Sequence, residues 1–216
     1  MINPLSKAMI NQNSKDKATL ERMAGIFKKY TKDSTLVGIG MGKTMRTFST
    51  VLTDSFTYVP SSNQTTQFLV GKITADIQNL SYVDIYFDSA DYYDKNGNLI
   101  KGGGGALTKE KLLLKMANRA VILVDKSKMK KTFNNILVPI EILKESYMYF
   151  MKILKEHKLK GQIRQVKDVS PFLTDNCNFI VDVEFNIEFL KLCKSITGVV
   201  EHGYFDNEIG FLIEEI

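Results

Sequence analysis

The feature that most constrains the fold of this 216-residue chain is the alternation of short apolar segments with amphipathic or glycine-rich segments over its first 125 residues. Residues 15–30 repeat apolar side chains with the period of a helix. Strands are expected at 35–39, 56–59, 83–88 and 120–124, with a helix over 108–117. Strands that alternate with helices form parallel sheets covered by helices. The first part of the chain therefore predicts an α/β, Rossmann-like parallel-sheet domain.

The second part of the chain has a different order of elements. Strands are expected at 136–142, 162–166, 178–184, 197–204 and 209–213, and helices at 144–157 and 186–195. Strand, helix, strand, strand, helix, strand is the order of ferredoxin-like α+β folds. We therefore expect an α/β domain of residues 1–131 plus 205–216, and a smaller ferredoxin-like α+β lid of residues 132–204.

Net charge is the one property of the composition that bears on partners. The formal net charge is +5, and between Lys126 and Lys167 eleven basic residues face three acidic ones. Such a stretch binds nucleic acid, attracts small anions or forms a solvated helix face. Only four of the 29 basic residues are arginine, whose rigid fork is preferred for reading bases and phosphates. We therefore expect no nucleic-acid partner.

Signals for a membrane, secretion or a metal are not found in the sequence. No apolar run approaches the ~20 residues of a membrane span, and the first fifteen residues lack the apolar core of a signal peptide. Cys177 and Cys193 have no metal-binding spacing, and His157 and His202 have no third ligand beside them. We expect a cytoplasmic protein with no metal and no membrane partner.

The glycine-rich segment GIGMGKT, residues 38–44, is close to two phosphate-binding motifs and fits neither. A Walker loop needs a glycine where this chain has Val37, and the dinucleotide fingerprint needs G-x-G-x-x-G rather than G-x-G-x-G. A glycine turn that opens a helix at Lys43 or Thr44 still presents free backbone amides to an anion. The same residues also fit a tight turn without a ligand, so both interpretations stay open.

Four side chains capable of proton transfer surround a second glycine run. Asp88 and Asp91 follow the strand 83–88, at the end where ligands bind in open α/β sheets. Lys101 precedes four glycines, and Glu110 falls in the first turn of the next helix. One carboxylate can remove a proton beside a carbonyl, another can relay protons between oxygens, and the ammonium can stabilise an enediolate. Glu110 alternatively serves only as a negative charge at a helix N-terminus.

Several segments, in their order and spacing, carry a family resemblance. They are VGIGMGKT, VDIYFDSADYYD, IKGGGGALTKEK, VDKSK, VPIEI, TDNCNFIVDV and GVVEHGYF. With these segments the chain resembles the type A ribose-5-phosphate isomerases over nearly its whole length. The resemblance implies an aldose–ketose isomerase of the non-oxidative pentose phosphate pathway, which interconverts ribose 5-phosphate and ribulose 5-phosphate through an enediolate. It further implies no metal or cofactor, and a homodimer or homotetramer.

The resemblance also implies roles for individual residues. Glu110 matches the base that moves the proton, and Asp88 and Asp91 match aspartates that assist ring opening and shuttle protons. Lys101 and the glycines after it would hold the oxyanion. The implied substrate-binding residues are Gly42, Lys43, Thr44, Ser89, Ala90, Gly102, Gly103, Gly104 and Lys128.

Three departures from the family pattern leave an alternative open. Met41 and Lys43 replace a threonine and a serine of the first loop, and Lys43 is our own candidate for the lost phosphate contact. Ser89 replaces a glycine, and Tyr92 stands where a glutamate usually follows. The alternative function is that of a diverged paralog, weakly active or inactive, that binds sugar phosphates.

Overall fold

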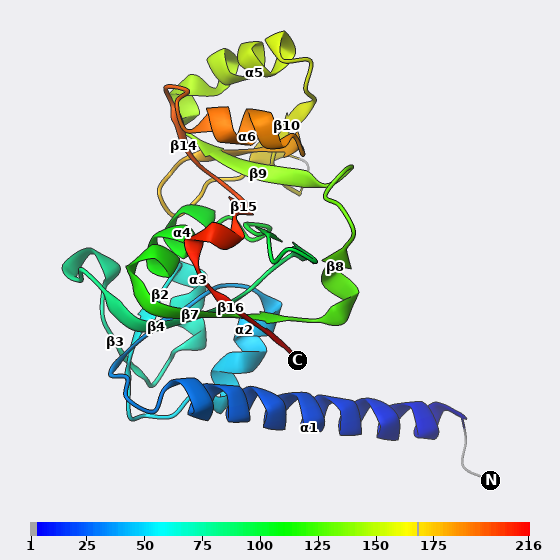
Figure 1. Cartoon of the computed structure of the whole chain (residues 1–216), viewed down its shortest axis with the longest axis vertical. Helices are drawn as coiled ribbons and strands as arrows, with labels where there is room; N and C mark the ends of the chain where they lie inside the picture. Colours follow the sequence, from blue (N-terminus) through cyan, green and yellow to red (C-terminus); the bar gives the residue numbers. More distant parts are fainter. Residues whose placement is uncertain (1–3, 168) are drawn as a thin grey trace.

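The computed structural model describes residues 4–167 and 169–216. Its largest sheet is six-stranded and parallel (Figure 1). The strand order is β16-β7-β4-β1-β2-β3. These strands are β1 (Leu36–Ile39), β2 (Thr57–Pro60), β3 (Ile73–Thr74), β4 (Val83–Ser89), β7 (Ala117–Val124) and β16 (Leu212–Glu215). The prediction of an α/β fold with a parallel sheet is confirmed.

Four helices accompany this sheet. They are α1 (Pro4–Tyr30), α2 (Lys43–Phe48), α3 (Asn63–Phe68) and α4 (Leu107–Met116). Helix α1 begins at Pro4 rather than near residue 15, and α3 was not predicted at all. Within the described residues, no helix is both long enough and apolar enough to cross a membrane.

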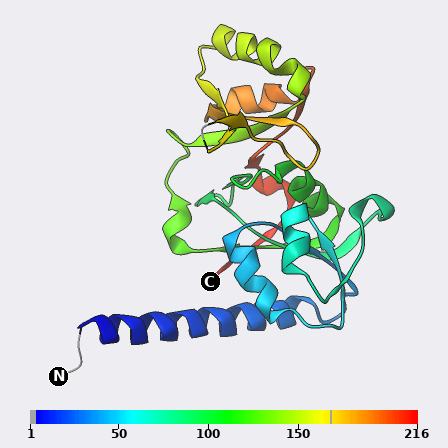
Figure 2. The same cartoon turned by 180° about the vertical axis from the view of Figure 1, so that it is seen from behind.

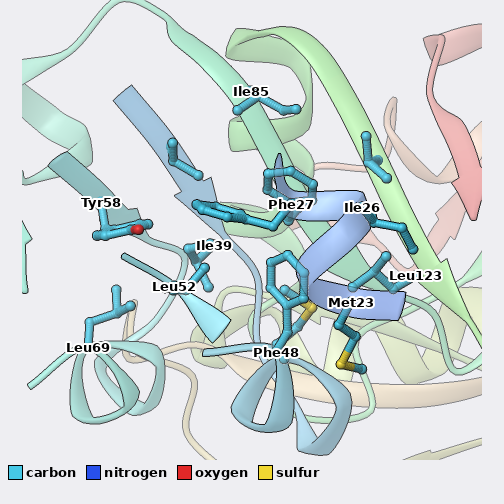
Figure 3. Close-up of a cluster of buried hydrophobic side chains, with 14 residues drawn as sticks. Met23, Ile26, Phe27, Ile39, Phe48, Leu52, Tyr58, Leu69, Ile85 and Leu123 are labelled. Atoms are coloured by element: carbon cyan, nitrogen blue, oxygen red, sulfur yellow. The ribbon is translucent and has the colours of Figure 1, made fainter. Parts of the chain in front are cut away.

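Alternate side chains of the strands enter two separate cores, because successive residues of a strand point to opposite faces. On one face, α1 and α2 cover the strands, and Figure 3 shows Met23, Phe27 and Phe48 against Ile39 and Ile85. On the other face, Leu113 and Leu114 of α4 pack with Tyr86 and Ile122. Both faces are therefore buried, which explains why the central strands read as nearly continuous apolar runs.

A second, antiparallel sheet lies at the opposite end of the molecule from α1 (Figures 1 and 2). Its order is β10-β13-β9-β14, from β9 (Leu137–Ile142), β10 (Gly161–Ile163), β13 (Phe179–Glu184) and β14 (Val199–His202). Helices α5 (Tyr147–Glu156) and α6 (Ile187–Cys193) pack on it through a third core that includes Phe150, Phe189 and Cys193. The order along the chain is the predicted ferredoxin-like one, and we call these elements the ferredoxin-like unit.

Short strands that the sequence analysis did not predict connect the two larger sheets. One small sheet has the order β15-β6-β5-β8, from β5 (Tyr92–Asp94), β6 (Leu99–Ile100), β8 (Met129–Lys130) and β15 (Tyr204–Phe205). The predicted strand 162–166 is divided at Arg164, and β11 (Gln165–Val166) pairs with β12 (Ser170–Pro171) instead. Strands of two or three residues are too short to show a period of two.

The hairpin between β5 and β6 brings two predicted site residues together. Its turn is the segment DKNGN, in which the Asp94 carboxylate accepts the amides of Asn96 and Asn98 at 2.9 Å. Gly97 adopts a φ of 83°, a left-handed conformation that favours glycine. The hairpin returns the chain so that the amide of Asp91 donates to the carbonyl of Ile100 at 2.9 Å, directly beside Lys101.

Candidate active site

Asp88 is a completely buried carboxylate at the carboxyl end of the central strand β4. It accepts hydrogen bonds from the hydroxyl of Tyr86 and, at 2.7 Å, from the amide of Ser89. Burial raises the pKa of Asp88, and Lys101 and Tyr86 oppose that rise. A Cβ on Gly40 would lie 1.9 Å from Asp88 Oδ1. Position 40 therefore requires glycine, because any side chain there would collide with the Asp88 carboxylate.

Lys101 is a buried cation that joins two carboxylates. Its Nζ lies 2.7 Å from Asp88 Oδ2 and 3.1 Å from Glu110 Oε2, and it donates to the carbonyl of Ser89 at 2.6 Å. Burial alone would lower the pKa of Lys101, but the charges of Asp88 and Glu110 outweigh burial and raise it. The backbone amide of Lys101 donates to the carbonyl of Gly203 at 2.8 Å, so the C-terminal part of the chain helps to hold it.

Glu110 lies in the first turn of α4 with its side chain only 3% exposed. Burial and the nearby Asp88 charge raise the pKa of Glu110 to about 8, although Lys101 acts in the opposite direction. Among the described residues, Glu110 Oε2 is buried without a well-aligned hydrogen bond, even though Lys101 Nζ is close. A buried carboxylate with a raised pKa is suited to accept a proton.

The glycine loop, residues 101–106, is enclosed by other parts of the protein. A Cβ on Gly104 would lie 2.1 Å from Met41 Cε, and a Cβ on Gly105 would lie 2.4 Å from the ring of Phe172. Gly105 also adopts a φ of 87°. On the remaining side, the amide of Gly103 donates to Asp91 Oδ2 at 2.8 Å. The loop is therefore packed between the β1–α2 turn, Asp91 and the ferredoxin-like unit.

A cavity of about 150 Å³ opens at this cluster. It is lined by Met41, Gly42, Lys43, Thr44, Ser89, Asp91, Lys101, Gly102, Gly103, Gly104, Glu110 and Lys128. Of the predicted site residues, only Asp88 and Ala90 do not line it. Asp88 lies behind Lys101, and the carbonyl of Ala90 accepts a hydrogen bond from Lys128 Nζ at 2.7 Å. Eleven of the thirteen predicted site residues therefore line one cavity.

Groups suited to bind an anion are also part of the cavity lining. Gly42 precedes α2, and among the described residues no side chain caps this helix. The amides of Lys43 and Thr44 are in the first turn, where a helix has no internal partners for its N–H groups. Lys43 and Lys128 add two positive charges to the cavity lining. Among the described residues, no three side chains are grouped so as to hold a metal ion.

Three residues at the site were missed as functional candidates. Tyr86 contacts Asp88, and the alternation of side chains along β4 was a usable signal, because residues 86 and 88 share a face. Met41 fills the space beside Gly104. Arg164, from the ferredoxin-like unit, donates to the carbonyls of Gly102 and Gly103. Neither Met41 nor Arg164 has a sequence signal for its contact.

Comparison with known proteins identifies the family. The family model of ribose 5-phosphate isomerase A (phosphoriboisomerase A) matches residues 57–212. This chain belongs to the ribose-5-phosphate isomerase A family. It is 35% identical over 195 residues to the ribose-5-phosphate isomerase A of Archaeoglobus fulgidus, and the matched region covers 82% of this chain and 86% of that protein.

Solved structures of ribose-5-phosphate isomerases have the same fold. The enzyme of Methanocaldococcus jannaschii superposes with a TM-score of 0.77 at 31% identity, covering 88% of this chain and 91% of that one. A D-ribose-5-phosphate isomerase in complex with phospho-erythronic acid superposes with a TM-score of 0.81 at 27% identity, and the match covers 92% of this chain and 95% of that one. The chain is therefore an isomerase, and the fold expected from the family resemblance is confirmed.

The departures from the usual ribose-5-phosphate isomerase A pattern are accommodated without blocking the cavity. Ser89 is 8% exposed, and its amide and carbonyl hold Asp88 and Lys101. Tyr92 packs against the core of the ferredoxin-like unit, and Lys130 Nζ lies 5.2 Å from its ring centroid. Met41 lies against Gly104. Met41 thereby links the two glycine segments.

Gly104→Ala tests whether Met41 and the glycine loop constrain each other. We expect KM for ribose 5-phosphate to rise several-fold, because the added Cβ meets Met41 Cε and displaces it or the loop toward the cavity. Removal of the methionine side chain in M41A/G104A should restore most of the lost affinity. Gly25→Ala is the control, since a Cβ there has no atom within 4 Å. Steady-state kinetics measure KM for each variant. An unchanged KM in G104A would show that the Met41 side chain can move aside without affecting the cavity.

Proposed function

We propose that this isomerase interconverts ribose 5-phosphate and ribulose 5-phosphate in the non-oxidative pentose phosphate pathway. The observation that carries the proposal is the buried cluster of Asp88, Lys101 and Glu110 at a small cavity that Lys43 and Lys128 also line. A proton-transfer group, a fixed cation and further positive charges together match the needs of a phosphorylated sugar that isomerises through an enediolate.

Glu110 moves the proton in the proposed mechanism. Its carboxylate removes the proton from C2 of the open-chain aldose, and the electron pair moves to the carbonyl oxygen on C1, giving an enediolate. The same carboxyl then returns the proton to C1, and the hydroxyl proton on O2 passes to O1. A base whose pKa is raised toward the working pH holds and releases a proton with similar ease.

Lys101 and the glycine loop stabilise the developing negative charge on the sugar oxygens. The ammonium of Lys101 lines the cavity with Gly102, Gly103 and Gly104, and its position is fixed before substrate arrives. Asp91 also lines the cavity and is placed to relay protons between sugar oxygens or to assist ring opening. Asp88 does not line it, so we assign to Asp88 the positioning of Lys101.

We propose that the phosphate binds to the amides and ammonium groups of the cavity lining. Gly42, Lys43 and Thr44 supply amides and one ammonium, and Lys128 supplies a second ammonium near Ser89 and Ala90. A doubly charged phosphate also benefits from the basic character of the 126–167 stretch, which favours the approach of small anions.

A coupled assay with purified protein and ribose 5-phosphate tests the proposal. Turnover to ribulose 5-phosphate without added metal or cofactor is the expected result. Binding of the sugar phosphate without turnover would instead support the diverged paralog. The retained Asp88, Asp91, Lys101 and Glu110 favour turnover, and nothing in their geometry favours the paralog.

Lys43→Ala tests our assignment of the phosphate contact. If the Lys43 ammonium replaces the hydroxyls of the usual family loop, its removal should raise KM about tenfold, the effect of losing one charge-assisted hydrogen bond at an accessible site. Turnover should change much less, because the phosphate is bound equally in the ground state and the transition state. Lys28→Ala on the exposed side of α1 is the control. An unchanged KM would remove Lys43 from the site.

We further propose that the enzyme is a cytoplasmic homodimer or homotetramer, and that 1–131 plus 205–216 and 132–204 are its domains. Support for an interface comes from the exposed apolar side chains of α5, where Met148 is 76% and Tyr149 53% exposed. Light scattering of the purified enzyme distinguishes monomer, dimer and tetramer. Limited proteolysis tests the domain boundaries, and cleavage within 131–136 and 203–206 is the expected result.

A further inference from the structure

Arg164 interrupts the edge of the ferredoxin-like unit between β10 and β11. Its backbone is fixed, since its amide donates to the carbonyl of Ile180 and its carbonyl accepts from the amide of Phe172, both at 2.8 Å. The side chain is fixed as well. Arg164 Nε donates to Asp182 Oδ2 at 2.9 Å, and Nη2 pairs with Oδ1 of the same carboxylate. Such a two-pronged pair holds the guanidinium plane in one orientation.

The free edge of this guanidinium contacts the glycine loop from outside the cavity. Arg164 Nη1 donates to the carbonyl of Gly102 at 2.8 Å and to the carbonyl of Gly103 at 3.0 Å. Arg164 itself does not line the cavity. The guanidinium and the substrate would therefore lie on opposite sides of the same two peptide groups.

Each of these peptide groups has its N–H on the side opposite its carbonyl, because the peptide unit is planar and trans. The peptide after Gly102 ends in the amide of Gly103, which donates to Asp91 at 2.8 Å. The next peptide ends in the amide of Gly104, a cavity-lining residue. A cation on the carbonyl oxygens fixes both planes and strengthens the N–H groups as donors, since linked hydrogen bonds polarise one another.

We propose that Arg164 is a positioning residue of the isomerase, which acts through the peptides of Gly102 and Gly103 to orient Asp91 and the amide of Gly104 toward the developing oxyanion. The inference rests on the proposed function of this cavity. It assigns to the ferredoxin-like unit a direct part in the preorganisation of the site, since Arg164 and Asp182 both belong to that unit.

The test compares Arg164→Met, Arg164→Lys and Asp182→Asn with wild type, and uses Arg22→Met on α1 as the exposed control. We expect R164M to lower kcat about 10- to 100-fold, somewhat less than the loss of a direct oxyanion donor. KM should change less than about threefold, because the amides act on charge that develops only in the transition state. R164K keeps the positive charge but loses the planar guanidinium, so its kcat should lie between those of R164M and wild type. The kcat of D182N should lie in the same range.

A second measurement separates positioning from folding. Phospho-erythronic acid carries a carboxylate where the enediolate would develop charge, so R164M should bind it at least about tenfold more weakly than wild type by calorimetry. Wild-type kcat and analogue affinity in R164M would overturn the inference while leaving the proposed function intact. Wild-type protein without turnover would instead contradict the proposed function, and the analogue affinity would still decide the role of Arg164. If kcat of R164M fell and KM rose by the same factor, the positioning role of Arg164 would also be contradicted.

Discussion

Glu110→Gln is expected to abolish nearly all turnover while leaving the molecule folded. The substitution keeps the shape of the side chain but removes its ability to accept a proton, and general acid–base groups contribute about 10²- to 10⁴-fold to the rate. We therefore expect kcat to fall about 10³-fold with little change in KM. Glu145→Gln, on an exposed carboxylate, is the matched control. A rate that survives in E110Q would overturn the assignment of the base.

The pH dependence of the wild-type enzyme gives an independent check on Glu110. Because the pKa of Glu110 is raised to about 8, its reactive ionised form accumulates only as the pH rises through that value. We expect kcat/KM of the wild type to fall as the pH is lowered below about 8. A pH profile that is flat from 6 to 9 would contradict the raised pKa.

Stability should respond to E110Q in the opposite sense from activity. The folded-state pKa of Glu110 lies above its ordinary value of 4.5, so the folded protein retains a proton that the unfolded chain releases between pH 4.5 and about 8. Wild-type stability therefore loses this contribution as the pH rises. E110Q stays neutral at every pH and should melt at a higher temperature than wild type at pH 9, with little difference at pH 4. Circular dichroism melts check both values.

Lys101→Met is expected to lose both activity and stability. The substitution leaves the carboxylates of Asp88 and Glu110 buried without their shared cation. Removal of one partner from a buried ion pair commonly costs about 3–5 kcal/mol, because the remaining charge is neither solvated nor paired. The free energy of unfolding, measured by denaturant titration at pH 8, should fall by about that amount.

Acidic conditions should reduce the stability loss in K101M. Both carboxyls can become neutral as the pH falls, and a neutral carboxyl needs no cation. The difference between K101M and wild type should therefore shrink between pH 8 and pH 5. Lys32→Met, an exposed substitution, should show no such trend. A K101M protein as stable as wild type at pH 8 would mean that Asp88 and Glu110 are not ionised together in the native state.

The fold could be predicted where burial determines the sequence pattern. Strands β1, β4 and β7 are covered on both faces, so each reads as an apolar run, and the ferredoxin-like order follows from longer elements. The small sheet of β5, β6, β8 and β15 could not be predicted, because its pairing depends on contacts between residues more than a hundred positions apart. Helix α1 begins earlier than its amphipathic pattern, so periodicity did not mark its first residue.

The sequence proposed which residues could form a site, but not how they are arranged. Sequence motifs indicated Asp88, Asp91, Lys101 and Glu110, without showing that the hairpin after β4 brings Asp91 close to Lys101. No local pattern could show that Lys101 joins both carboxylates, since their distances depend on how α4 packs against β4. The sequence gives no sign of the contact between Arg164 and the glycine loop, because the two lie about sixty residues apart and neither is part of a regular strand or helix.

The hydrogen bond from the amide of Lys101 to the carbonyl of Gly203 has a consequence for biosynthesis. Strand β15 then pairs with β6, and β16 completes the edge of the parallel sheet beside β7. These partners of Lys101 and of β6 are synthesised about a hundred residues after Lys101 itself. A nascent polypeptide therefore holds Lys101 without this support until the ribosome has passed residue 203.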